Sequence, residues 1–353
     1  MTENDVRLNL ILENFIFFKD RNRFMESENQ ISKTKKIIIT CLITTALLFF
    51  LISAPFWALN EQYGFVLFVA YPLSLGILSG FLVSFFTKEA TRTFVYIFKT
   101  TIILTVISIL VFLFYAKEGL ICVLMALPVV YFFLFLGTAF GSVIYLRVWS
   151  KYLLILTILF FNISAYIYDR NDRELDLHNV ETRVEIDASK KEIWDKINSP
   201  FKFGEAENFF LRNGVSYPIF MEILKHDKNK ILHCVYTNGE TSARVSSFVD
   251  RNRIAFSFSE PQVTMKETSF YGEVEPKHIR GKIWARSGEF RLVEISENKT
   301  RLVATTEYVN NLGPKFYWEL WENYLMDEMH RHVLNNVKKK VESERTHSHF
   351  ETD

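Results

Sequence analysis

The feature that most constrains this chain is a change in charge density near residue 168. Residues 1–168 contain 13 Lys and Arg and 9 Asp and Glu side chains, most of them outside the long apolar runs. Residues 169–353 contain 28 basic and 31 acidic side chains. Long uncharged runs followed by a charged half predict a membrane region followed by a water-soluble domain.

The apolar half contains runs that match the thickness of a bilayer. A spanning helix needs about 20 mostly apolar residues, because the hydrocarbon core is roughly 30 Å thick and a helix rises about 1.5 Å per residue. Gly137 and Gly141 have the small-x-x-x-small spacing that is typical of closely packed helices. After an N-terminal cytoplasmic segment, 1–36, we expect a membrane domain, 37–168, with about five spans at 37–59, 64–86, 95–116, 120–146 and 152–168.

Basic residues beside the spans predict their orientation, because short cytoplasmic loops are enriched in Lys and Arg. Lys33, Lys35 and Lys36 precede the first run, and the second and fourth loops are more basic than the first and third. We therefore expect an integral protein of the inner or plasma membrane with a cytoplasmic N-terminus and an extracytoplasmic C-terminal domain. Four spans instead of five would leave that domain in the cytoplasm, since 152–168 is the shortest run.

The charged half has the pattern of an α+β domain over residues 180–343. Its first segment alternates apolar and polar residues like a strand, and Ser189 with Glu192 forms a capping-box pattern before a short helix. Alternating segments separated by turn residues then predict antiparallel strands. A long helix begins at Pro314, with Leu320 and Tyr324 expected in its apolar stripe and Glu319 and Glu322 on its polar face. Residues 344–353 are a tail. A curved sheet against one long helix favours an apolar cavity between them.

Several short motifs follow one another in this half. They lie at 184–194, 288–292, 300–302, 305–308, 317–321 and 330–338. Together they resemble the START-like SRPBCC superfamily, the polyketide cyclase/dehydrase and lipid-transport group. The resemblance implies a helix-grip fold over 180–343, in which an antiparallel sheet wraps a long C-terminal helix. It indicates function weakly, because the fold hosts many activities.

The sequence contains no motif for catalysis or metal binding. A Ser/His/Asp order, a phosphate-binding glycine loop and a HExxH helix are absent, so we expect no catalytic residues, no metal and no cofactor. His330 and His332 are two residues apart and cannot both face one metal ion on a helix. The formal net charge of +1 argues against a broad nucleic-acid surface.

Aromatic and polar residues near the expected cavity are candidates for ligand contacts. The aromatic residues are expected either to line a ligand cavity or to form plain core. Glu289 either anchors a ligand from inside or forms cross-strand ion pairs outside. The ligand-cavity candidates are Trp284, Glu289, Glu307, Tyr308, Tyr317, Trp321, Tyr324 and His332.

Three functions are compatible with this organisation. The leading one is a membrane-anchored START-like domain that binds a lipid or another hydrophobic small molecule at the bilayer surface, with membrane lipids as its partners. The second is a polyketide cyclase/dehydrase-like enzyme that uses Glu289, Glu307 or His332 for acid and base catalysis. The third is a membrane sensor or assembly partner. We expect a binding module rather than an enzyme.

Overall fold

The protein was analysed as a computed structural model that describes residues 31–49, 64–87, 94–114, 119–147, 151–171, 176–226, 229–269, 271–275, 279 and 281–350. The chain divides into two compact units. The second unit comprises Gln62–Phe65, Ile109–Pro128 and Tyr166–Asp353, so it contains the whole charged domain and short parts of the apolar helices.

The apolar half is helical throughout its described residues. Three helical stretches are long and apolar enough to cross a membrane, namely Val66–Thr87, Phe94–Phe114 and Leu120–Tyr145, and they coincide with three of the predicted spans. The predicted span 37–59 continues beyond the described residues, and the predicted span 152–168 lies within a helix; both stay predictions as spans. The helices are residues 31–48, η2 (Val66–Ala70), α3 (Tyr71–Thr87), α4 (Phe94–Phe114), α5 (Leu120–Arg147) and α6 (Lys151–Asn171).

Glycines hold α3 and α5 at backbone contact. A Cβ atom on Gly137 or Gly141 would collide with the backbone of α3 at Leu73 and Ile77. A Cβ atom on Gly76 would collide with the backbone of α5 at Leu134. The predicted role of the small-x-x-x-small pair in helix packing is therefore confirmed, because only glycine allows the two backbones to approach this closely.

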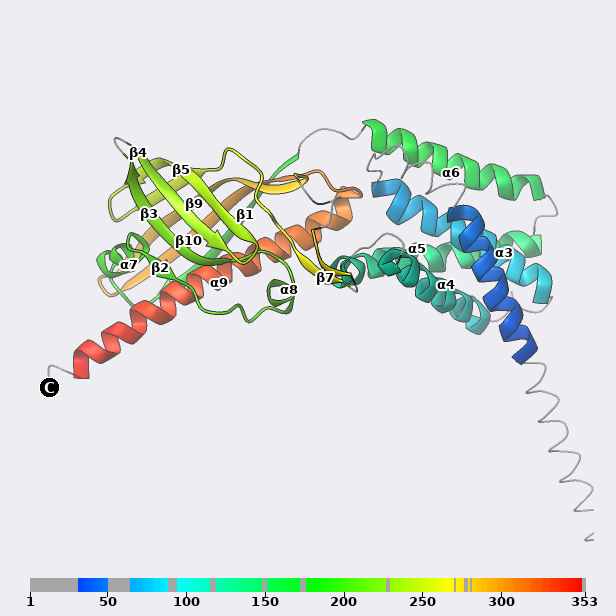
Figure 1. Cartoon of the computed structure of the whole chain (residues 1–353), viewed down its shortest axis with the longest axis horizontal. Coiled ribbons are helices and arrows are strands. Elements are labelled where there is room, and N and C mark those ends of the chain that lie inside the picture. The colour runs from blue at the N-terminus through cyan, green and yellow to red at the C-terminus, as the bar shows by residue number, and fades with distance from the viewer. Residues whose placement is uncertain are drawn as a thin grey trace, which may run out of the picture. The chain divides into compact units, whose positions relative to one another are not determined.

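The charged half contains one large antiparallel sheet. Its eight strands follow the order β1-β10-β9-β6-β5-β4-β3-β2, and β7 and β8 form a separate pair. Figure 1 shows the long helix α9 lying along the sheet. The bounds are β1 (Asp176–Ile186), α7 (Lys190–Ile197), β2 (Phe201–Lys202), α8 (Phe209–Arg212), β3 (Pro218–His226), β4 (Asn229–Tyr236), β5 (Gly239–Val249), β6 (Arg253–Ser257), β7 (Glu267–Ser269), β8 (Gly272–Val274), β9 (Ile283–Ser296), β10 (Lys299–Asn310) and α9 (Lys315–Phe350).

The sheet, α7 and α9 enclose one hydrophobic core. Trp194 of α7, Leu302 of β10 and Leu334 of α9 are among its fully or almost fully buried side chains. The predicted capping box is present, because the Glu192 N–H donates to the Ser189 hydroxyl and the Ser189 N–H donates to the Glu192 carboxylate at 2.7 Å. The predicted α+β helix-grip fold, a sheet gripping one long C-terminal helix, is confirmed.

The buried face of α9 differs from the predicted one over its first three turns. Leu320, expected in the apolar stripe, is 68% exposed, and Tyr324 is 40% exposed. Trp318 and Glu322 are each only 5% exposed. The prediction that Glu322 lies on the polar face is wrong, because the sheet packs against the helix face that carries Trp318 rather than the face that carries Leu320.

Candidate functional site

An apolar pocket with a volume of about 120 Å³ lies within the second unit, beside the first four turns of α9. This is comparable with the ~150 Å³ apolar cavities that take up a benzene-sized molecule. The helix contributes Trp318, Trp321, Glu322, Leu325, Met326 and Met329. The other walls come from β4, β9, the segments 215–216 and 262–265, Ile279, Leu312, and the start of α5.

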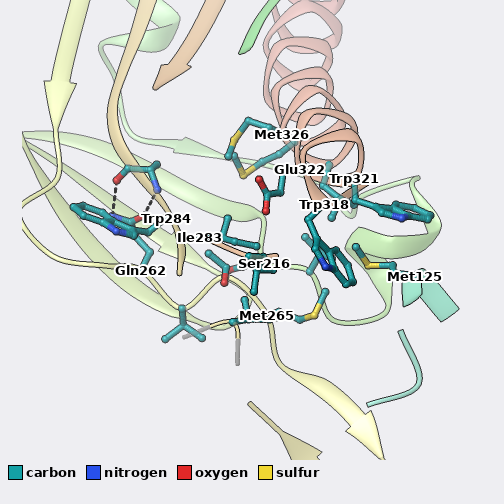
Figure 2. Close-up of a pocket in the computed structure, with 18 of the residues that line it drawn as sticks. Met125, Ser216, Gln262, Met265, Ile283, Trp284, Trp318, Trp321, Glu322 and Met326 are labelled. Carbon is teal, nitrogen blue, oxygen red and sulfur yellow. Dashed lines mark hydrogen bonds between the residues drawn. The ribbon is translucent and has the colours of Figure 1, made fainter. Parts of the chain in front are cut away.

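Four aromatic and four methionine side chains are among the twenty residues that line the pocket. Figure 2 shows Trp284 on one side of the pocket, and Trp318 and Trp321 on the other. Met125, Met265 and Met326 add flexible, polarisable side chains that adapt to differently shaped ligands. An apolar lining with a few polar groups is typical of small-molecule sites.

Glu322 places a carboxyl group in this apolar lining. Figure 2 shows its oxygens directed into the pocket, toward Ser216 and Ile283. Burial raises the pKa of Glu322 to about 8, and the negative charge of Glu319 adds to the shift, while the side-chain amide of Asn310 opposes it. The Asn310 nitrogen and both Glu322 oxygens nevertheless make no hydrogen bond of good geometry with any described residue. Glu322 is therefore mostly a neutral carboxylic acid at pH 7, able to donate or accept a proton.

Gln262 fixes the wall that carries Trp284. Its side-chain oxygen accepts from the Ala285 N–H at 3.0 Å, and its side-chain nitrogen donates to the Ala285 carbonyl at 3.2 Å. The same nitrogen donates to the Glu260 carbonyl at 2.9 Å. The two bonds to Ala285 are drawn in Figure 2 beside the strand that carries Trp284. The pairing of β9 with β6 ends at Ser287 and Ser257, so the side-chain amide of Gln262 supplies partners for Ala285 beyond the end of that pairing.

Glu267 connects the pocket wall to the start of α5. Its carboxylate accepts from the Cys122 N–H at 2.9 Å, and the side chain is almost fully buried. A carboxylate is stabilised at a helix N-terminus, because the first N–H groups of the helix have no partners within the helix. Cys122 and Met125 of α5 both line the pocket, so Glu267 holds this part of the wall in place.

A second pocket of about 70 Å³ adjoins the first and shares Tyr236, Ala285 and Met329 with it. His330 lines the second pocket between two hydroxyl groups, with Nδ1 at 3.0 Å from the Thr182 oxygen and Nε2 at 2.7 Å from the Thr306 oxygen. The Thr182 hydroxyl donates to Asp327 at 2.6 Å, so it can only accept from the imidazole. Nδ1 therefore carries the proton, and Nε2 accepts from Thr306.

His330 stays neutral in this network. Burial lowers its pKa to about 4, although the nearby Asp327 carboxylate acts in the opposite direction. Asp327 is itself held ionised by the Thr182 hydroxyl and by Arg331, whose Nε donates to it at 2.7 Å. With all its polar atoms paired, the network fits a structural role in joining β1, β10 and α9.

The eight candidates from the sequence occupy different places. Trp284 and Trp321 line the first pocket, and Glu289 lines the second while forming an ion pair with Arg253 at 2.6 Å. The other candidates lie outside both linings. Tyr308 donates to Asn323, Tyr317 donates to the Met125 carbonyl, Tyr324 accepts from Asn208, His332 packs against Phe203 and Tyr217, and Glu307 is exposed.

Sequence reasoning did not select Glu322, Trp318, Gln262 or Ser216. A signal for Glu322 was present, because Trp318, Leu325, Met326 and Met329 lie four residues before it and three, four and seven residues after it. These positions share one helix face, so Glu322 interrupts an apolar face. Gln262 and Ser216 lie in irregular segments and have no comparable signal. Among the described residues, no group of three or more His, Cys, Asp or Glu side chains is arranged to hold a metal ion.

Several solved structures are similar to the charged half of the chain. No protein-family model and no curated protein matches. Among solved structures, a norcoclaurine synthase point mutant from Thalictrum flavum is similar over 49% of this chain and 98% of its own, with 12% identity and a TM-score of 0.31. The Zhui aromatase/cyclase from Streptomyces is similar over 47% of this chain and 94% of its own, with 15% identity and a TM-score of 0.30.

A START superfamily protein from Mycobacterium smegmatis is similar over 47% of this chain and 98% of its own, with 14% identity and a TM-score of 0.29. The name of this last protein is that of the superfamily that the sequence motifs resemble. At this level of similarity, the description of the fold rests on the strand order and the gripped helix of this chain itself.

Proposed function

We propose that the charged domain binds a hydrophobic small molecule, a membrane lipid or a similarly apolar compound, in the pocket beside α9. The observation that carries this proposal is the set of Trp and Met side chains around a space of about 120 Å³. Transfer of apolar surface from water into such a site is favourable by about 0.8 kcal/mol per buried CH₂ group.

The apolar helices then serve as the membrane anchor. Three of them are long and apolar enough to span a bilayer. Only the residues 172–175 separate α6 from β1, so the anchor and the binding domain follow each other closely in the sequence. A domain tied to a bilayer meets hydrophobic molecules at a much higher local concentration than a free domain, which favours a lipid as the ligand. We place the domain on the extracytoplasmic side, in line with the positive-inside pattern.

The proposal is tested by asking what the protein carries from the membrane. The full chain, purified in a mild detergent, is analysed by native mass spectrometry and by solvent extraction. We expect a hydrophobic compound in stoichiometric amount with the wild type. Met326→Trp places a larger side chain in the pocket and is expected to lose the compound, whereas Leu320→Trp adds the same side chain to an exposed position of α9 and is expected to retain it.

Two results would contradict this proposal. One is a wild-type protein that carries no compound and binds none when hydrophobic probes are added. The other is equal retention by Met326→Trp and the wild type. Thermal unfolding of each variant separates the loss of binding from the loss of folding, and Ala285→Leu fills the pocket from the strand side if Met326→Trp does not fold.

Glu322 also favours a second candidate function, acid and base catalysis on a bound hydrophobic substrate. A carboxyl whose pKa is about 8 exchanges protons readily near neutral pH, which suits a general acid or base. In a dehydration, the carboxylic acid would donate its proton to the departing hydroxyl, which leaves as water. The resulting carboxylate would take the proton from the adjacent carbon as the double bond forms, which restores the acid. The Glu322→Gln variant would then carry the substrate, whereas the wild type would carry the product. The masses of the two compounds would differ by one water molecule. Identical compounds in both proteins would rule this candidate out.

A further inference from the structure

The polar groups of the pocket fall into two classes, those already satisfied by the protein and those left for a ligand. The Gln262 amide is engaged by backbone groups of Glu260 and Ala285, and the Trp318 indole N–H donates to the Gly313 carbonyl at 3.0 Å. The buried Ser216 hydroxyl and both Glu322 oxygens have no partner among the described residues. Leaving such groups unpaired costs about 1–3 kcal/mol each, so a ligand that pairs with them gains affinity.

The charges around Glu322 make the pocket favourable for a cation. Among the residues that the structure describes, no Lys, Arg or His side chain lines it. Glu319, one turn earlier on α9, adds negative charge close to Glu322 and is contacted by His178 of β1 at 3.2 Å. The other polar or titratable groups that face this region are neutral side chains or a paired carboxylate, namely Tyr308 and Asn310 of β10, Tyr236 of β4, Cys122 of α5 and Glu267 of β7.

The walls suit an alkylated cation in particular. Trp284, Trp318 and Trp321 line the pocket together with Glu322. Indole faces carry partial negative charge and attract ammonium groups, an interaction worth roughly 2 kcal/mol or more where water is excluded. A methylated ammonium also buries apolar surface against these rings, whereas a carboxylate or phosphate head would find no cationic partner among the described lining residues.

The geometry points to a hydrophobic molecule that carries an alkylated ammonium group, whose charge pairs with Glu322 and whose alkyl groups lie against the tryptophan side chains. This inference rests on the proposed binding function and names the ligand class of that same site. Ser216, on the opposite wall, accepts or donates a further hydrogen bond to the ligand.

Binding of such a cation requires Glu322 to release its proton to the solvent. With an empty-pocket pKa of about 8, the carboxyl is mostly protonated below that pH and mostly ionised above it. A quaternary ammonium does not titrate, so the pH dependence of its affinity reports the ionisation of the protein alone. Its dissociation constant should fall about tenfold per pH unit below pH 8 and level off above.

The test measures binding of three six-carbon probes to the full chain in an uncharged maltoside detergent by titration calorimetry. The probes are hexyltrimethylammonium, hexanol and hexanoate. We expect the cation to bind roughly 50- to 100-fold more tightly at about pH 9 than at about pH 6. The affinity of hexanol should not depend on pH, and hexanoate should be the weakest binder of the three. Glu322→Gln should abolish the pH dependence for the cation, and hexanol binding to this variant should stay independent of pH. Glu240→Gln, at an exposed carboxylate of β5, should behave as the wild type.

The outcomes separate this inference from the proposed function. If hexanol binds but the cation shows no preference and no pH dependence, the ligand class is wrong while the pocket still binds hydrophobic molecules. If Glu322→Gln keeps the wild-type pH dependence, another group controls binding and the inference is overturned. If none of the probes binds at either pH, both the inference and the proposed function fail.

Discussion

Glu322 lies one helical turn after Trp318 on α9, and both side chains are buried against the same apolar pocket. The indole N–H of Trp318 is satisfied by the Gly313 carbonyl, whereas the Glu322 carboxyl has no hydrogen-bond partner among the described residues. The folded protein therefore holds one unpaired carboxyl in an apolar site, and this affects both its stability and its binding.

The first prediction concerns stability and pH. The folded-state pKa of Glu322 is raised to about 8, so between about pH 4.5 and 8 the folded chain binds a proton that the unfolded chain releases, and stability falls as pH rises. The folded-state pKa of His330 is lowered to about 4, so between about pH 4 and 6.5 stability rises with pH. The two effects offset each other up to about pH 6.5, and we expect a net fall between about pH 6.5 and 8.

Glu322→Gln removes the group that lowers stability as pH rises and leaves His330, which raises it. The variant should show a rise in Tm up to about pH 6.5 and no fall above it, and at pH 8 it should be more stable than the wild type by about 1–3 kcal/mol. Thermal unfolding of the full chain across this pH range measures both effects. A fall between pH 6.5 and 8 that persists in Glu322→Gln would show that another group is responsible.

The second prediction concerns the His330 network. Thr306→Val removes the hydroxyl that donates to Nε2 and leaves a buried acceptor unpaired, so we expect a loss of about 1–3 kcal/mol of unfolding free energy. Thr241→Val, the same substitution on β5, should change stability by less than about 0.5 kcal/mol. Denaturant unfolding of the two variants makes the comparison. If Thr306→Val were as stable as Thr241→Val, the Thr306 hydroxyl would contribute nothing to stability.

The third prediction concerns Gln262. Gln262→Leu removes the side-chain bonds to the Ala285 N–H and carbonyl, so this part of β9 should open more readily. Hydrogen–deuterium exchange should be faster in the peptide that covers Ile283–Ser287, by about tenfold if one net hydrogen bond of ~1.4 kcal/mol is lost. Ser259→Ala, at an exposed position of the same connecting segment, should leave exchange there unchanged. Unchanged exchange in Gln262→Leu would contradict a bracing role.

The fourth prediction concerns the contact between α3 and α5. Gly137→Leu places a large side chain where even a Cβ atom meets the backbone of α3, so we expect the helices to separate and the purified chain to aggregate or unfold at lower temperature. Val143→Leu, at an outward-facing position of α5, should be tolerated. Size-exclusion chromatography and thermal unfolding of both variants give the readout. Normal behaviour of Gly137→Leu would contradict backbone contact at this site.

The fifth prediction concerns topology. Five spans place the C-terminus outside the cytoplasm. Alkaline phosphatase fused after Asp353 should therefore be active and a fused green fluorescent protein dark. The opposite pattern would indicate an even number of spans and a cytoplasmic binding domain. A fusion after Arg147 provides the matched control, because the fourth loop is expected inside under either count.

Much of the architecture follows from local patterns in the sequence. The apolar runs at 64–86, 95–116 and 120–146 predict helices, because a mostly apolar run of that length satisfies its backbone polar groups in a bilayer only as a helix. Ser189 and Glu192 predict a helix start because their hydrogen bonds are local. The glycine pair at 137 and 141 predicts close packing because its spacing places both glycines on one helix face.

The composition of the pocket depended on contacts between segments that are far apart in the sequence, and no local pattern predicts such contacts. Leu320 and Trp318 are both apolar residues near the start of α9, and either could face the sheet until the sheet's position is known. Gln262 and Ser216 lie in irregular segments, and only the folding of the sheet brings them to the same space as Glu322.

The sequence by itself determined which segments are apolar helices, strands and the long C-terminal helix, because these depend on the spacing of side chains along the chain. The tertiary structure alone decided that Glu322 is buried and that Leu320 is exposed. The physical reason is that burial depends on which helix face the sheet covers, and that is decided by the packing of the whole domain rather than by the helix itself.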